Sequence, residues 1–223
     1  MDSANLSRRS LLALGGAGVL ACAAASTPLA AADPAAAMDD DPWTRLVAGN
    51  ARFVAGRPAH PRQDPAYRRS LVAGQQPFAC VLGCADSRVP AELLFDQGLG
   101  DLFTVRAVGE VLDDAVVGSV EYAVEHLGVR LVVVLGHSGC GAVKAAVDLV
   151  RGTSEVTGSV STVARAIEAT VRATPGQPDF LAACVRNQAS RVAEELPRRS
   201  GLLHGADLVP AVYDLASGLV HRH

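Results

Sequence analysis

Stretches with helical spacing of apolar residues alternate with short, wholly apolar runs from residue 41 onward. In residues 41–56 apolar side chains recur on one helical face, Asp41 is available as an N-cap and Pro42 stands at the first helical position. This segment is therefore predicted to be a helix. Residues 57–69, rich in proline and arginine, follow as a predicted extended arm of the kind that often lies on a partner subunit.

Beyond the arm, strand and helix patterns alternate in a regular order. Residues 77–83 form a short apolar run, which is typical of a buried parallel strand. Further strands are predicted at 101–108 and 129–136, and helices at 91–97, at 115–128 and from about residue 142. Two successive crossover units predict an α/β fold, with a mostly parallel β-sheet flanked by helices on both faces.

The composition fits one globular domain with a sizeable core, because 49% of the 223 residues are hydrophobic. The formal net charge is -3, and it becomes -4 without residues 1–32, whose charged residues are Asp2, Arg8 and Arg9. A mildly acidic chain without a basic stripe is a poor candidate for nucleic-acid binding. No nucleic-acid partner is therefore expected.

The first 32 residues resemble an export signal of the twin-arginine type. Arg8 and Arg9, in the stretch SRRSLL, precede a weakly apolar run and then an Ala-rich stretch. A transmembrane anchor is the alternative, but the run is too short and glycine-rich to span a membrane comfortably. We expect residues 1–32 to be a signal peptide, residues 33–223 to form a single domain, and the protein to be exported to the periplasm or beyond.

The cleavage site has two candidates. The stretch VLAC, ending at Cys22, resembles a lipoprotein box, whereas LAAAD, ending at Asp33, suits an ordinary A-x-A site. Leu20 stands where such boxes usually carry a smaller residue. A lipid on Cys22 would be the only expected link to a membrane.

Three side chains with soft donor atoms follow two of the predicted strands. Cys84 comes directly after the first strand, and His137 and Cys140 come after the third. Because sites form at the carboxyl ends of the strands in such sheets, these loops can meet. Two thiolates and one imidazole leave one tetrahedral position open, which is the catalytic rather than the structural arrangement of zinc.

Asp86 is a further carboxylate beside Cys84. Arg88, two positions on, could hold this carboxylate in a bidentate ion pair and so keep it off the metal.

Other interpretations of the same residues exist. Taken alone, Cys84 would more often be a buried apolar thiol, as expected for Cys80 and Cys184, and an exported chain could use a disulfide. The stretch GHSGCG resembles a hydrolase turn with Ser138 as nucleophile, but Cys140 breaks the G-x-S-x-G pattern. Arg106 and Glu110 are equally compatible with an ordinary loop ion pair.

These motifs together resemble the β-class carbonic anhydrases. The family's C-x-D-S-R signature is matched by CADSR (residues 84–88), and its H-x-x-C with flanking glycines by HSGCG (residues 137–141). Similarity covers roughly residues 43–220, including GNARFVAG and VYDLASGLV.

The resemblance implies a zinc enzyme that interconverts carbon dioxide and bicarbonate, in which residues 33–223 form a single catalytic domain. It also implies a homodimer or a larger homo-oligomer and one zinc ion per subunit. By position, the resemblance makes Cys84, His137 and Cys140 the zinc ligands, and Asp86 with Arg88 the catalytic pair.

One loop departs from the family's pattern. Where many members read VRNAGN, this chain reads VRAVGE over residues 105–110, which places a carboxylate in a loop that lines or supports the substrate cleft. This loop leaves open a zinc-binding relative with little turnover. A carbon disulfide or carbonyl sulfide hydrolase on the same fold is a further alternative, because the motifs do not separate substrates that differ by sulfur for oxygen.

Overall fold

The computed structural model describes residues 41–223. The predicted export signal and Cys22 lie outside these residues. The elements, in chain order, are α1 (Pro42–Val54), α2 (Pro65–Ser70), β1 (Ala79–Gly83), α3 (Ala91–Leu94), β2 (Leu102–Arg106), α4 (Asp114–Glu121), β3 (Leu131–His137), α5 (Gly141–Arg151), α6 (Val160–Ala173), α7 (Phe180–Arg199), β4 (Asp207–Tyr213) and β5 (Val220–Arg222).

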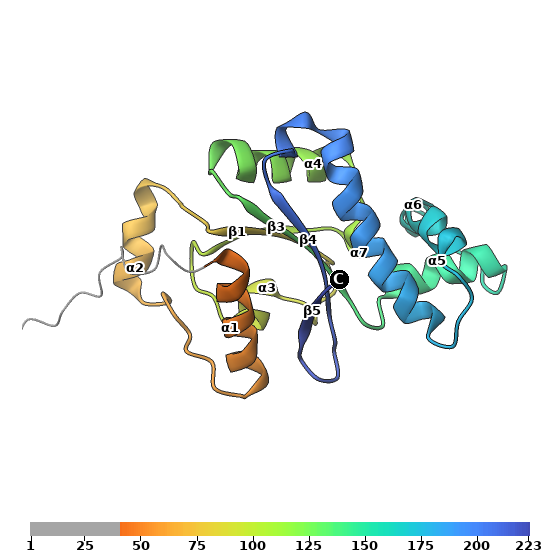
Figure 1. Cartoon of the computed structure of the whole chain (residues 1–223), viewed down its shortest axis with the longest axis horizontal. Helices are drawn as coiled ribbons and strands as arrows, with labels where there is room; N and C mark the ends of the chain where they lie inside the picture. The colour runs from red at the N-terminus through yellow and green to blue at the C-terminus, as the bar shows by residue number, and fades with distance from the viewer. Residues whose placement is uncertain (1–40) are drawn as a thin grey trace, which may run out of the picture. The chain divides into compact units, whose positions relative to one another are not determined.

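The strands form one five-stranded sheet in the order β2-β1-β3-β4-β5 (Figure 1). The four strands from β1 to β4 are parallel, and β5 runs antiparallel to β4. Every residue of β1 and β3 is buried, as expected of central strands covered on both faces. The predicted α/β fold with a mostly parallel sheet is confirmed.

Side chains that alternate along the strands face two different cores. On one face Leu82 and Val134 pack with α4 and α7, and on the other Val81 and Val133 pack with α1 and α3. Strand side chains point alternately to opposite faces, so each face of the sheet needs its own cover of helices. The prediction of helices on both faces is therefore correct.

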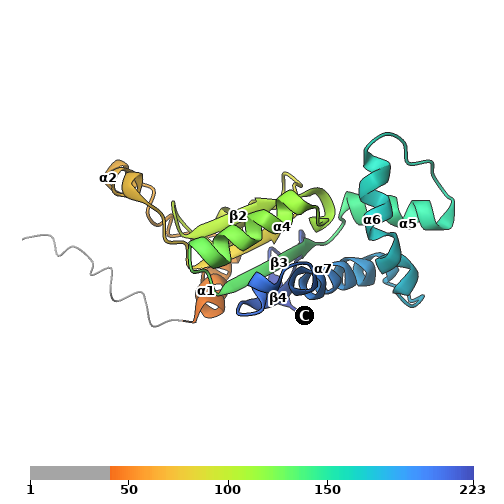
Figure 2. The same cartoon turned by 90° about the horizontal axis from the view of Figure 1, so that it is seen from above.

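A third core lies beyond the carboxyl ends of β1 and β3. Helices α5 and α6 pack together there with the first half of α7, and this core includes Cys84 and Cys140. Figures 1 and 2 both place α5 and α6 at the end of the described unit opposite α2. The apolar faces of these helices enclose the strand ends where the predicted site lies.

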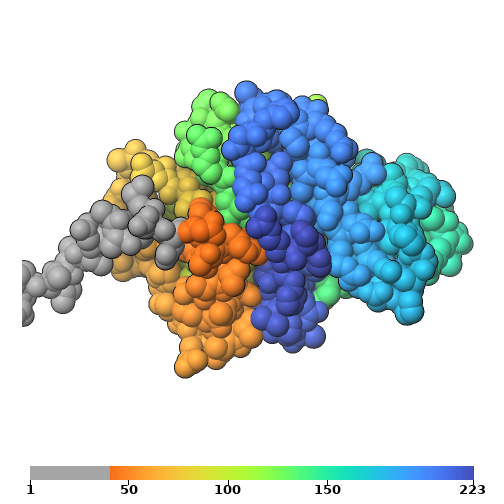
Figure 3. Space-filling view, viewed as in Figure 1, coloured from red at the N-terminus to blue at the C-terminus, as the bar shows by residue number. Residues whose placement is uncertain are grey.

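Helix α1 begins as predicted, because the Asp41 side chain accepts the backbone N–H of Thr44 at 2.9 Å and Pro42 is its first residue. Asn50 joins α1 to the carboxy-terminal hairpin: its Nδ2 donates to the Gly218 carbonyl at 2.9 Å and its Oδ1 accepts the Val220 N–H at 3.0 Å. Figure 3 shows α1 lying against the chain's last residues on this face.

Several boundaries differ from the sequence prediction. The predicted helix at 91–97 is only one turn, Ala91–Leu94, and the arm contains α2 at Pro65–Ser70. Strand β3 extends to His137, which was expected just after the strand. Among the described residues, no helix is both long and apolar enough to cross a membrane.

Candidate metal centre

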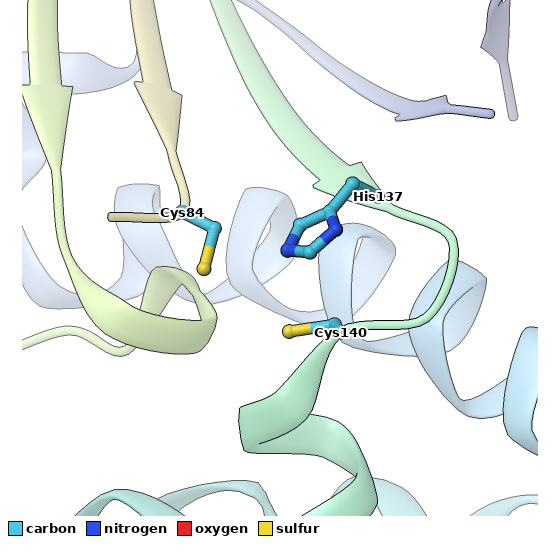
Figure 4. Close-up of side chains that lie close together, drawn as sticks. All are labelled: Cys84, His137 and Cys140. Carbon is cyan, nitrogen blue, oxygen red and sulfur yellow. The ribbon is translucent and has the colours of Figure 1, made fainter. Parts of the chain in front are cut away.

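Cys84, His137 and Cys140 place their donor atoms within 4.8 Å of one another, and all three residues are buried. Cys84 directly follows β1, His137 ends β3, and Cys140 directly precedes α5. Because β1 and β3 are adjacent parallel strands, their carboxyl ends bring these three side chains together. Figure 4 shows the three side chains pointing toward one another.

The His137 ring is oriented as in a metal-binding histidine. Its Nδ1 lies 3.1 Å from the Ser138 carbonyl oxygen, to which an Nδ1–H can donate, and its Nε2 is buried without a hydrogen-bond partner. A carbonyl that holds one ring nitrogen leaves the other as a lone pair for a metal. The orphaned Nε2 faces two sulfur atoms, a donor set that suits zinc.

The two thiols of the centre share one environment. A hydrogen bond from Cys140 lowers the pKa of the Cys84 thiol, against the effect of its burial. The same contact raises the pKa of Cys140. Both cysteines are free thiols, as are the buried Cys80 and Cys184, so the described residues contain no disulfide.

Cys80 and Cys184 are ordinary buried thiols, as the sequence suggested. Burial raises the pKa of Cys80 to about 12 and also raises that of Cys184. Neither thiol belongs to the cluster of potential metal ligands.

Asp86 faces the centre and is held by Arg88. Its Oδ2 lies 3.8 Å from His137 Nε2. Arg88 donates from Nε to Asp86 Oδ1 at 2.9 Å, from Nη2 to Oδ2 at 2.7 Å and from its backbone N–H to Oδ1 at 2.9 Å. These hydrogen bonds from Arg88 lower the pKa of Asp86, so its carboxylate is an ionised acceptor at neutral pH.

Arg106 supports the same loop, a role that sequence reasoning missed. Its Nε donates to the Cys84 carbonyl at 3.1 Å and its Nη2 to the Asp86 carbonyl at 2.6 Å. The ion pair between Arg106 and Glu110 that the sequence allowed does not form, because the Arg106 guanidinium donates to backbone carbonyls instead. Its place at the end of β2, beside β1, was the only sequence signal for this role.

Glu110 lies inside the protein beside the centre. Only 2% of its surface is exposed, its Oε1 has no hydrogen-bond partner, and its backbone is left-handed with φ 52°. Burial raises the pKa of Glu110 well above its ordinary value, and the charge of Cys84 acts in the same direction. The departure in the VRAVGE loop therefore places a buried carboxyl group near the thiols, and one of its oxygens has no hydrogen-bond partner.

A mostly apolar cavity of about 290 Å³ opens onto Cys84 and Asp86. Its walls come mainly from α5 and from the start of α6, with one residue of the loop after β2. The apolar lining consists of Ala85, Val108, Ala142, Ala145, Val160, Val163 and Ala164, together with Gly141. The cavity can admit a small apolar molecule to the face of the centre that carries Asp86.

Ser138, the candidate hydrolase nucleophile, has a structural role. Its Oγ accepts the backbone N–H of Leu215 at 2.9 Å, and its own backbone N–H donates to the Tyr213 carbonyl at 2.9 Å. These bonds fasten the loop after β3 to the end of β4. The hydrolase interpretation therefore finds no support.

Comparison with known proteins agrees with this geometry. A family model described as carbonic anhydrase matches residues 79–220. Carbonic anhydrase 2 of Mycobacterium tuberculosis is 62% identical over 104 residues, which are 47% of this chain and 50% of that protein. The chain thus spans about half the length of the curated relatives it matches.

Two solved structures share the fold. The β-carbonic anhydrase CcaA superposes with a TM-score of 0.63 at 24% identity, covering 81% of this chain and 87% of that one. A structure from a study of two tetrameric β-carbonic anhydrases from Sordaria macrospora superposes with a TM-score of 0.62 at 22% identity, covering 82% and 97%. The family model and the shared fold lead to one conclusion: this chain belongs to the carbonic anhydrase family, and its fold is that of the β class.

Proposed function

We propose that this protein catalyses the reversible hydration of carbon dioxide to bicarbonate and a proton, with one zinc ion held by Cys84, His137 and Cys140. The observation that carries the proposal is the convergence of these three donors beside a restrained carboxylate. Three protein ligands leave a position open for water. When bound, zinc supplies Lewis-acid activation of that water.

The chain's own residues then position the reactants. Asp86 accepts a hydrogen bond from the reacting water and orients it toward the cavity. Arg88 keeps both oxygens of Asp86 occupied, so that this carboxylate stays off the metal. The apolar cavity walls favour an uncharged substrate over water beside the centre.

The deciding experiment is stopped-flow carbon dioxide hydration by the zinc-loaded protein. A matched variant, Cys140→Ser, removes one ligand, whereas Cys184→Ser changes a free buried thiol outside the centre. We expect fast hydration by the unmodified protein and by Cys184→Ser, and none above background by Cys140→Ser. Full zinc occupancy without hydration would reject the proposal, and carbonyl sulfide and carbon disulfide would then be assayed in its place.

We further propose that the protein works as a homo-oligomer. The S. macrospora structures are described as tetrameric. Val108 and Val160, beside the cavity, are 47% and 58% exposed, and apolar side chains at a site entrance favour cover by a partner. Light scattering at micromolar concentration should give at least twice the monomer mass, and a monomer mass would refute this.

Export through the twin-arginine route is also a proposal, supported by the stretch SRRSLL and the small-residue run that follows it. Arg8→Lys with Arg9→Lys should keep the protein inside the cell. Mass spectrometry of the exported chain would find either an acyl group on Cys22 or a free amino terminus near Asp33. Export that persists in the lysine variant would exclude this route.

A further inference from the structure

A buried polar chain runs from α6 and α7 to the metal centre. Gln188 of α7 and Thr170 of α6 are 3% and 2% exposed. Ile167 and Val185, each three residues earlier on the same helices, belong to the third core. Burying an amide in such surroundings is costly unless its donors and acceptors are paired. The hydrogen-bond partners of Gln188 therefore indicate the role of this buried amide.

Both ends of the Gln188 amide are used. Thr170 Oγ1 donates to Gln188 Oε1 at 2.7 Å, and Gln188 Nε2 donates to the Gly109 carbonyl at 3.2 Å. A carbonyl oxygen can only accept, so the amide nitrogen must face Gly109. The Gly109 carbonyl thus fixes the orientation of the amide, and the Thr170 hydroxyl, which can donate or accept, donates to the remaining oxygen.

Gly109 connects Gln188 to the sulfur of Cys84, one of the proposed metal ligands. Its backbone N–H donates to Cys84 Sγ at 3.3 Å, and its φ of 68° is left-handed. A Cβ at this position would lie 2.8 Å from both Ala142 Cβ and Ile167 Cδ1. The segment is therefore packed closely on one side and held by Gln188 at its carbonyl.

We propose that Gln188 is a positioning residue of the metal centre, which holds Gly109 so that its N–H stays on the Cys84 sulfur. The inference rests on the proposed function, because it assumes that Cys84 binds the metal. An N–H group on a thiolate withdraws electron density from the sulfur. Partners of this kind around the ligands tune metal affinity and ligand basicity.

A purely structural role for Gln188 makes a different prediction. If the amide only fills and pairs a buried space, its loss lowers stability and leaves the electronic state of the metal–sulfur bond unchanged. A spectroscopic measurement on that bond separates the two roles, whereas activity alone does not.

The test uses the full protein with cobalt(II) in place of zinc, because thiolate-to-cobalt charge-transfer absorption reports directly on Cys84 and Cys140. Gln188→Met keeps the shape of the side chain and removes both hydrogen bonds. Val192→Ala, a buried apolar truncation on the same helix, is the control for lost stability. Cobalt affinity is measured in parallel by competition with a chelator.

We expect Gln188→Met to shift the charge-transfer band to longer wavelength and to weaken cobalt binding about tenfold, while Val192→Ala leaves both unchanged. Thr170→Val, which frees the Gln188 amide but keeps it, should give a smaller shift in the same direction. The Thr170→Val variant tests the inference by itself if Gln188→Met fails to fold. Unchanged band and affinity in the variants that fold would overturn the inference. A missing charge-transfer band in the unmodified protein would instead refute the proposed ligand set.

Discussion

Arg88 is more exposed than the carboxylate it holds, with 54% of its side chain accessible against 18% for Asp86. An exposed ion pair contributes little to stability, so the pair's value lies in orientation. The bidentate contact fixes the plane of the Asp86 carboxylate next to His137. In the proposed mechanism Asp86 aims a reacting water, a task for which geometry of this kind matters.

Arg88→Ala is expected to keep zinc bound and to lower kcat at least 100-fold, because a released Asp86 can turn onto the metal. Arg88→Lys should recover only part of the loss, since lysine lacks the bidentate geometry. Zinc content by mass spectrometry and stopped-flow hydration check both statements. Near-normal turnover in Arg88→Ala would remove this residue from the mechanism.

Glu110→Gln should raise the melting temperature of the zinc-loaded protein. Burial raises the pKa of Glu110, so at pH 7 the folded chain favours the protonated carboxyl while the unfolded chain ionises it, and this difference lowers stability. A neutral amide of the same shape avoids that cost. Differential scanning calorimetry measures the change. A lower melting temperature would mean that Glu110 has a bonding partner in the loaded centre.

Asp96 offers a pH-dependent test away from the centre. Although burial opposes it, the N–H groups of Ala59 and His60 and the guanidinium of Arg52 lower the pKa of Asp96 below its ordinary 3.8. A depressed pKa stabilises the fold above the unfolded value, and this contribution is lost as pH falls through the folded value.

Asp96→Asn is therefore expected to lose about 2 kcal/mol of unfolding free energy at pH 7. Asparagine tolerates the left-handed φ of 45° at this position, so backbone strain does not confuse the comparison. Urea unfolding at several pH values should show the gap from the unmodified protein closing below about pH 4. A gap that is constant across pH would contradict the assignment.

At the level of elements, α1 depends on a close approach to the chain just after α3. A Cβ added at Gly49 would lie 1.7 Å from the Phe95 carbonyl oxygen. Gly118, in α4, has no atom within 4 Å of the same construction. The two glycines therefore make a matched pair, each within a helix.

Gly49→Ala should cost more than 2 kcal/mol, because α1 must move away from the chain just after α3. Gly118→Ala should instead gain about 0.5–1 kcal/mol from helix propensity. Chemical denaturation of both variants supplies the measurement. Equal effects at the two positions would show that the approach of α1 is not restrictive.

The elements that sequence predicted best are those whose pattern matches their burial. The runs in β1 and β3 are apolar throughout and fully buried, so the pattern alone identifies them. Strand β4 was not predicted: it carries Pro210, which sequence reasoning disfavours within a strand, and its burial is uneven. The π-helical turn Tyr122–His126 after α4 has no sequence signal of its own.

Some residues of the site could be predicted from the sequence and others could not. Cys84, His137 and Cys140 could be predicted because two strand ends meet at one edge of the sheet. Arg106 and Gln188 could not, because their roles depend on side-chain direction and on partners remote in sequence.

On the scale of the whole described unit, the metal centre lies where β1, β3 and the third core meet. A metal held there joins two loops and the start of α5. Binding to the folded state alone adds RT ln(1 + [L]/Kd) to stability, about 2.7 kcal/mol at a hundredfold excess over Kd.

Removal of the metal with a chelator should therefore lower the melting temperature by about 5 °C or more. The double variant Cys84→Ser with Cys140→Ser should melt at one temperature with or without chelator. Thermal unfolding followed by circular dichroism tests both outcomes. No change on chelation of the unmodified protein would show that no metal binds the folded chain in preference to the unfolded one.

The register between β1 and β3 sets an order of events during folding. Ala79 pairs with Leu131, and the strand β2 and helix α4 lie between them in the chain. Such long-range pairing forms slowly, and Cys84 stays apart from His137 and Cys140 until it is complete. A metal ion therefore binds with three ligands only after the central strands have paired. The rate of metal uptake during refolding then reports the rate at which β1 and β3 pair.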